Sequence, residues 1–318
     1  MITLAWLYIP AGLMFAAVAL RSALDRANSR RWGTAAFWGL MALSLLAGDL
    51  LGDFGNGVLV LALAGLAGFG LVGRGVAQTT DEPERERSAA RLGNRVFLPA
   101  LIIPATALVG TLAYNYTPLG DAGWIEAKRE TYVFLVIGVL LALAVIFAWL
   151  RPPALAPVEE GRRLLDAIGW AAVLPQLLAA LGAVFAAAGV GEIVGGLVGA
   201  AIPEGSVFLT VTALALGMAA FTIVMGNAFA AFPVMAAAIG VPLLIRGYGG
   251  DPAVIGAVGM LAGFCGTLMT PMAANFNLVP AALLELKNPY AVIRAQVPTA
   301  IPLLAANIAI LYVFGGFG

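Results

Sequence analysis

Long apolar stretches separated by short charged loops dominate this 318-residue chain. An α-helix needs about 20 consecutive apolar residues to cross the hydrocarbon core of a bilayer, and most of these stretches approach or exceed that length. Only 11% of the residues are charged and 62% are hydrophobic, whereas soluble domains have about 25% and about 45–50%. One soluble core cannot hide so much apolar surface. The sequence therefore predicts an all-α, polytopic membrane protein.

Nine apolar runs are interpreted as membrane segments. Six of them have charged or turn residues at their ends and are expected to cross once each. These six are residues 2–20, 32–47, 58–73, 96–114, 132–150 and 168–190. The last third adds residues 207–245, 253–286 and 297–314. Because 207–245 is long enough for two passes, the sequence predicts about eight crossings plus a re-entrant hairpin, or ten crossings.

Arginines indicate which loops lie in the cytoplasm, because short loops rich in Lys and Arg stay inside. They cluster after the first, third and fifth crossings, at residues 21–31, 74–95 and 151–163. The loop 115–130, which should lie outside, also holds one Lys and one Arg, but three acids accompany them. Both termini are therefore expected outside.

Two loops that contain no Lys or Arg are also expected outside. Asp49 and Asp53 follow the second crossing, and Glu192 and Glu204 follow the sixth. In contrast, the mixed-charge stretch 79–90 is expected to be a solvated cytoplasmic connector, because it has no apolar periodicity from which to build a core. We divide the chain into an N-terminal region of helices and connectors, 1–166, and a C-terminal transport-like region, 167–318.

Composition excludes several classes of function. The chain has no histidine and one cysteine, Cys265, so it can form no internal disulfide, Cys/His zinc site or Ser-His-Asp triad. The 17 basic and 17 acidic residues balance, which gives no reason to expect a nucleic-acid partner. No G-x-x-x-x-G-K-[ST] motif for ATP is present. Any transport would therefore depend on an ion gradient or on the gradient of the substrate.

The uncharged run 207–245 contains a turn signal at its centre. Gly226-Asn227 is a turn dipeptide because both residues tolerate positive φ, yet no charged residue flanks it as in a soluble loop. Two geometries remain open: two full helices joined at the cytoplasmic surface, or a re-entrant hairpin whose tip stops inside the protein. Non-helical backbone at membrane depth is tolerated only where it is buried or lines a wet cavity. The second geometry therefore makes Gly226 and Asn227 part of a site.

The run 253–286 is too long for one straight crossing and is interrupted at its centre, where Gly and Pro oppose a continuous helix. Hydroxyl and amide side chains lie at the same place, and unwound polar backbone near the middle of a bilayer is typical of transporters. Isolated polar residues elsewhere, such as Thr222 and Asn307, are interpreted as interhelical contacts. The candidate binding residues of the interruption are Gly266, Thr267, Thr270, Pro271, Asn275 and Asn277.

The segments GNAFAAFPVMAAAIGVPLLI and GMLAGFCGTLMTPMAANFNLVPAALLELKNP closely resemble a bacterial membrane family whose members are described as one subunit of a pyroglutamate (5-oxoproline) transporter. The resemblance extends over the whole chain, including GDLLGDFGNGVLVL at residues 48–61. It implies a place in the bacterial inner membrane and a second, smaller membrane subunit as partner.

Both subunits are similar to the ion-transporter superfamily, in which a hairpin tip of the type Ser-Asn-Thr and an unwound helix hold substrate and sodium. Gly226-Asn227-Ala228 stands where that tip would be, and only Asn227 matches. The superfamily's motifs occur twice in inverted halves, but this chain has one strong set, and residues 98–105 are a poor second candidate. By analogy, the partner is expected to supply the missing half of the site.

These features predict a carrier subunit, not an enzyme, that binds a small carboxylate at the membrane midplane. No Lys or Arg lies within the late crossings, so helix N-termini and Asn and Thr donors would hold the anion. No cofactor is expected, apart from sodium as coupling ion at the same residues. Sodium is favoured over protons because residues 207–284 contain no charged group except Arg246 and Asp251 near the surface.

Two alternatives belong to other classes of protein. A non-transporting membrane scaffold would have the same composition, but it has no use for polar backbone at midplane. An intramembrane aspartyl enzyme would need two carboxylates close enough to share a proton. Asp49 and Asp53 are the candidates, although Asp at the end of a crossing is an ordinary turn or cap residue.

Overall fold

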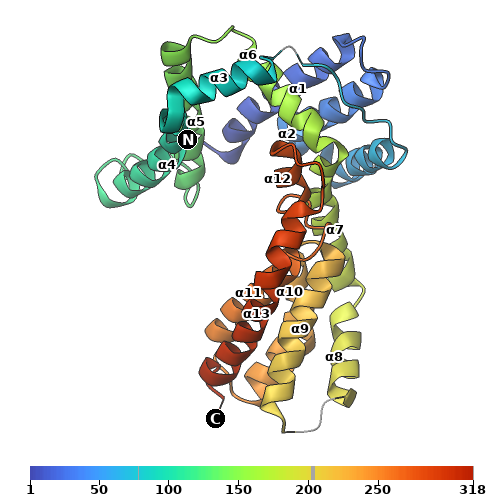
Figure 1. Ribbon diagram of the computed structural model, residues 1–318. Coiled ribbons are helices and arrows are strands. Elements are labelled where there is room, and N and C mark those ends of the chain that lie inside the picture. Colours follow the sequence, from blue (N-terminus) through green and yellow to red (C-terminus); the bar gives the residue numbers. More distant parts are fainter. Residues whose placement is uncertain (78, 202–204, 318) are drawn as a thin grey trace. The chain divides into compact units, whose positions relative to one another are not determined.

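The computed structural model describes residues 1–77, 79–201 and 205–317, and Glu204 lies outside this part of the chain (Figure 1). The described residues are predominantly helical, with one isolated β-bridge between Ile2 and Ile125 and no strand among them. The prediction of an all-α fold is confirmed. The chain forms two compact units, residues 1–166 and 167–318, which are described separately.

The first unit contains six α-helices and a short 3₁₀-helix. They are α1 (Leu4–Leu24), α2 (Arg31–Gly68), α3 (Glu82–Leu92), η1 (Gly93–Phe97), α4 (Leu98–Tyr116), α5 (Glu130–Leu150) and α6 (Ala156–Ile168), whose last residues lead into the second unit. Contacts pair α1 with α2 and α4 with α5.

The second unit is built from shorter helices as well as long ones. They are η2 (Gly169–Val173), α7 (Leu174–Ala187), α8 (Val190–Ala201), α9 (Val207–Met225), α10 (Ala228–Met235), the π-helix η3 (Ala236–Gly247), α11 (Pro252–Thr267), α12 (Leu278–Leu283) and α13 (Ala291–Phe314). Across the described residues of both units, eight helices are long and apolar enough to cross a membrane.

Helix α2 is a hairpin of two antiparallel arms. Gly52 has φ 62° and ψ −177°, a conformation that interrupts the helix and suits glycine. The arms then lie side by side, because Gly33 in the first arm contacts the backbone of Leu71, which follows the second arm. At 1.5 Å per residue, each arm between Gly52 and this contact rises about 28 Å. The arms correspond to the two apolar runs 32–47 and 58–73.

An ion-pair network at one side of the first unit joins segments from the three arginine-rich loops. Arg162 of α6 pairs with Asp25, which follows α1, and its Nη1 lies 3.8 Å from Oε2 of Glu159. Arg21, in the last turn of α1, pairs with the same Glu159. Arg162 and Glu159 are each only 3% exposed. The network therefore binds the end of α1 to α6.

The connector after α2 completes this network with backbone donors. The N–H of Gly75 donates to Asp166 Oδ2 at 3.2 Å, and the N–H of Val76 donates to Asp25 Oδ2 at 2.8 Å. At another place in the unit, Ile2 donates to the carbonyl of Trp124 at 2.6 Å, and Glu126 donates back to Ile2 at 3.0 Å. The N-terminus thus lies against the loop 115–130.

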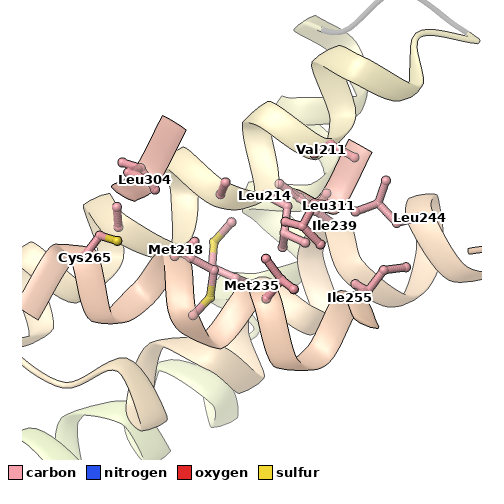
Figure 2. Close-up of a cluster of buried hydrophobic side chains, with 14 of the residues drawn as sticks. Val211, Leu214, Met218, Met235, Ile239, Leu244, Ile255, Cys265, Leu304 and Leu311 are labelled. Atoms are coloured by element: carbon pink, nitrogen blue, oxygen red, sulfur yellow. The ribbon is translucent and has the colours of Figure 1, made fainter. Parts of the chain in front are cut away.

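The core of the second unit forms where α9, α10, η3, α11 and α13 meet (Figure 2). Large apolar side chains from all five elements fill it, and Cys265 is part of it. Side-chain caps fix the starts of two of these helices: Ser206 accepts from the N–H of Leu209 in α9, and Asp251 accepts from the N–H of Ala253 in α11. The labelled core residues are Val211, Leu214, Met218, Met235, Ile239, Leu244, Ile255, Cys265, Leu304 and Leu311.

Helices η2 and α7 together cover most of the expected sixth crossing, 168–190. Helix α7 ends at Ala187, and α8 continues beyond it after a two-residue break at which Gly189 has φ 68°. Both helices follow α10 and η3 in the same direction. Ideal Cβ atoms built on Gly182, Gly191 and Gly195 would meet residues 230, 234 and 238 in turn.

Close packing at the glycines of α8 holds this helix against the same neighbours that α7 contacts. Gly191, in the first turn of α8, packs against Val234 and Ala237 of the neighbouring hairpin arm, and the next residue, Glu192, has an exposed side chain. The loop predicted at Glu192 is therefore wrong, because this residue belongs to a helix. Gly195 packs closely against Ala238, whereas Gly199 faces open space.

Candidate functional site

The Gly226-Asn227 turn packs against the irregular segment that follows α11. Gly226 ends α9 in the left-handed conformation, with φ 70°. A Cβ at this position would lie 2.5 Å from the carbonyl oxygen of Met272 and 2.8 Å from Cδ1 of Leu178. Only glycine satisfies both the backbone angle and the close approach. The two parts of the candidate site that the sequence singles out are therefore in contact.

The arms on either side of this turn are long. Helix α9 has 19 residues, and α10 with η3 continues for 20 residues from Ala228 to Gly247. At 1.5 Å per residue, α9 rises about 28 Å, close to the ~30 Å thickness of the hydrocarbon core. Of the two geometries that the sequence leaves open, these lengths favour two full crossings over a short re-entrant hairpin.

The irregular segment begins after Thr267 and not at Gly266. Helix α11 continues through Gly266, where an added Cβ would overlap the carbonyl oxygen of Ala219 in α9. Glycine at 266 therefore allows α9 and α11 to approach closely, and the expectation that it breaks the helix is wrong. Residues 268–277 contain turns and no helix, and α12 follows from Leu278.

Three of the predicted site residues hold this irregular segment in shape. Thr270 Oγ1 donates to the carbonyl of Ile223 in α9 at 2.8 Å. Asn277 Nδ2 donates to the carbonyls of Thr267 and Thr270, at 2.7 and 2.6 Å. Thr267 Oγ1 donates to the carbonyl of Phe264 within its own helix. Thr270 and Asn277 thereby satisfy backbone carbonyls that the helix ends leave unpaired.

The other predicted polar residues are more accessible. Asn227 caps α10, because its Oδ1 accepts from the N–H of Phe229 at 2.9 Å, and its side chain is half-buried. Its Nδ2 makes no hydrogen bond to any residue that the structure describes. Asn275 and Pro271 are exposed. Asn227 and Asn275 therefore offer amide groups to a ligand, whereas Pro271 only shapes the backbone.

Two buried oxygens near the turn have no hydrogen-bond partner within the described chain: Oδ1 of Asn277 and Oγ1 of Thr222. Both side chains are 0% exposed. Leaving a buried polar atom unpaired costs about 1–3 kcal/mol. Such oxygens can accept a hydrogen bond from a ligand N–H or coordinate a small cation.

A pocket of about 240 Å³ lies beside the irregular segment. Apolar side chains form most of its wall, and Asn307, which is 2% exposed, contributes an amide. Asn307 Nδ2 donates to Cys265 Sγ at 3.5 Å, so this pair links α13 to α11. The lining residues are Leu261, Phe264, Cys265, Thr267, Leu268, Phe276, Leu303 and Asn307.

Sequence reasoning missed the role of Thr222 and the place of Asn307 on this pocket. Both look like ordinary interhelical contacts, which fits the bond between Asn307 and Cys265. Thr222 lies one turn before Gly226 and Asn307 lies in α13, so neither belongs to the motifs that the sequence singles out. No group of three or more acidic or cysteine side chains that could hold a metal ion occurs among the described residues.

The fold and the two-part polar site define an all-α, multi-pass membrane protein with an interrupted helix beside a tight helical turn. The chain matches the family described as Protein of unknown function (DUF979) over residues 5–315, and it belongs to that family. Comparison with curated proteins gave no match, and comparison with solved structures gave none either.

Proposed function

We propose that this chain is one subunit of a secondary transporter for a small carboxylate, with 5-oxoproline as the substrate. The observation that carries the proposal is the contact between the Gly226-Asn227 turn and the irregular segment 268–277. A scaffold has no use for the accessible amides of Asn227 and Asn275, or for the unpaired buried oxygen of Asn277, that lie beside this contact.

The chemistry of 5-oxoproline suits this set of groups. Its lactam ring presents one N–H donor and one C=O acceptor, and a side-chain amide can pair with both. Asn227 and Asn275 supply amide donors, and Asn277 Oδ1 supplies a buried acceptor. The start of α10 adds its N-terminal partial positive charge, which favours a carboxylate in a site without Lys or Arg.

The bacterial inner membrane, with both termini outside, is the proposed location. The ion-pair network brings residues from the three arginine-rich segments together, as a shared cytoplasmic position requires. The bonds between Ile2 and residues 124–126 likewise place the N-terminus beside a loop that is expected outside. A second, smaller membrane subunit is proposed as partner, because this chain offers one strong set of site motifs.

The test is uptake of labelled 5-oxoproline by cells without their own uptake system that express this chain, its partner or both. Coexpression should raise uptake far more than it raises the amount of this chain in the membrane. Proline, which has the same ring without the carbonyl, should compete weakly. No uptake with both subunits would refute the substrate assignment. Robust uptake by the purified, reconstituted chain alone would refute the shared site.

The scaffold and enzyme alternatives have less support. Asp49 and Asp53 are exposed near the tip of the α2 hairpin, where Asp is an ordinary turn residue. An aspartyl site needs two carboxylates enclosed together so that they share one proton. A scaffold would be indicated if the partner expressed alone took up 5-oxoproline as well as the two subunits together.

A further inference from the structure

The interrupted crossing formed by α7 and α8 places a carboxylate far from both of its ends. Leu178, in α7, lies level with Gly226 at one end of the α10–η3 arm, and Gly191 lies level with Val234 and Ala237. Val234 is more than two helical turns from Gly226, and Ala237 is similarly far from Gly247. Glu192 follows Gly191 directly. It therefore lies near the middle of an apolar layer and not at a membrane surface.

The elements around Glu192 offer no charge to balance it. Helices α7 and α10 contain no titratable side chain, and Glu192 is the single acid of α8 among its described residues. In η3 the charged residue is Arg246, in the last turn, and Tyr248 follows that helix. The N–H of Glu192 donates to the carbonyl of Gly189 at 3.1 Å, which fixes the backbone but not the carboxylate.

An isolated carboxylate at this depth is expensive. Acidic side chains at the centre of a membrane helix are costly to insert, and they typically mark ion or proton pathways. Addition of one proton removes the charge and most of this cost. Sodium coupling was expected because residues 207–284 contain no carboxylate within a crossing. Glu192 in α8 is such a carboxylate.

We propose that Glu192 binds the coupling proton of the transporter, an inference that rests on the proposed function. The carboxylate takes up one proton on the outer side and releases it on the inner side in each cycle. Because the substrate is a monoanion, transport of one proton with it moves no net charge. Uptake should then respond to a pH gradient and not to membrane potential.

The transport test uses proteoliposomes that contain the chain with its partner. With the membrane potential clamped at zero, an inward proton gradient should stimulate uptake of 5-oxoproline several-fold in the wild type, and replacement of sodium by choline should not matter. Glu192→Gln should lose the stimulation but retain exchange of labelled for unlabelled substrate. Glu86→Gln, the same change on the exposed surface of α3, should behave as wild type.

A second measurement does not depend on transport. The apolar reagent dicyclohexylcarbodiimide adds to protonated carboxyl groups in apolar surroundings, and mass spectrometry locates the adduct. In membranes, Glu192 should be labelled, increasingly so as the pH is lowered, whereas Glu86 should not. A water-soluble carbodiimide should show the reverse preference.

The outcomes separate this inference from the function on which it rests. No uptake by the wild type, with labelling of Glu192, would refute the proposed substrate and leave the proton site standing. Uptake driven by sodium and not by the proton gradient would refute the inference alone. Full stimulation in Glu192→Gln, or no labelling of Glu192 at any pH, would also refute it.

Discussion

At the scale of single residues, the amides of the candidate site divide into those that hold the backbone and those that remain available. Asn277 is fully buried, and both of its N–H groups are used on carbonyls of the same segment. Asn227 and Asn275 are more accessible. This division decides which substitution tests ligand binding and which one tests folding.

Asn227→Ala and Asn275→Ala should each reduce uptake of 5-oxoproline while the protein stays folded and inserted. Loss of a hydrogen bond that a ligand group cannot replace costs about 1–3 kcal/mol, which corresponds to a roughly 5- to 150-fold loss of affinity. Labelled uptake by the complex, together with thermal unfolding of the purified chain, measures both effects. Asn115→Ala, at an exposed position in α4, is the control. Normal transport by both variants would mean that the site lies elsewhere.

Asp25 gives the first unit a stability that depends on pH. Burial favours the neutral acid, but the N–H groups of Val76 and Ala27 and the Arg162 guanidinium outweigh it, and the pKa of Asp25 is lowered. A carboxyl with a lowered pKa stabilises the fold above its unfolded pKa of about 3.9, and this contribution is lost as the pH falls through the folded pKa.

Asp25→Asn should therefore lower the melting temperature at neutral pH, and the difference from wild type should shrink below about pH 4. Thermal unfolding across this pH range measures it. Asp121→Asn, in an exposed loop, should cause little change at any pH. A difference for Asp25→Asn that stays constant down to the lowest pH would contradict the assignment.

At the scale of elements, glycines decide where helices turn and how closely they pack. Gly52 folds α2 into a hairpin, and Gly189 separates α7 from α8. Gly226 closes the turn between α9 and α10 against the carbonyl of Met272. Gly226 combines a positive φ with a close contact, so any side chain at this position would destabilise the fold for two separate reasons.

Gly226→Ala should destabilise the second unit by more than Gly249→Ala. Both glycines have φ 70°, but an added Cβ at Gly249 meets nothing within 4 Å, whereas at Gly226 it meets backbone. The difference in melting temperature therefore isolates the close approach of the turn to residue 272. Uptake by the complex should fall with Gly226→Ala as well. Equal effects of the two substitutions would show that the contact is dispensable.

At the scale of the whole molecule, the network around Arg162 and the bonds of Ile2 give a topology that experiment can check. Single cysteines at Ser29, Ser88 and Ala156 on a Cys265→Ala background should resist an impermeant thiol reagent in intact cells. A cysteine at Ala122, in the loop that contacts the N-terminus, should react. In permeabilised cells the reagent should label all four positions, which shows that none of these cysteines is too buried to react. Ready labelling of the first three in intact cells would overturn the orientation.

The sequence by itself determined the class of the protein, because the length of an apolar run and the charge of a loop act locally. An uncharged run such as 207–245 must leave water wherever its neighbours lie. The turn at Gly226-Asn227 and the interruption before Asn277 followed from local backbone preferences. The same reasoning misjudged Gly266, whose contact with Ala219 is an interhelical one.

Only the tertiary structure decided which of these segments meet. The packing of Gly226 on residue 272, and of Gly191 and Gly195 on the arm that holds Val234 and Ala238, depends on contacts between residues far apart in sequence. No local pattern encodes such a register. For this reason the sequence predicts a loop at Glu192, whereas the fold places this residue in α8, beside the arm that holds Val234 and Ala238.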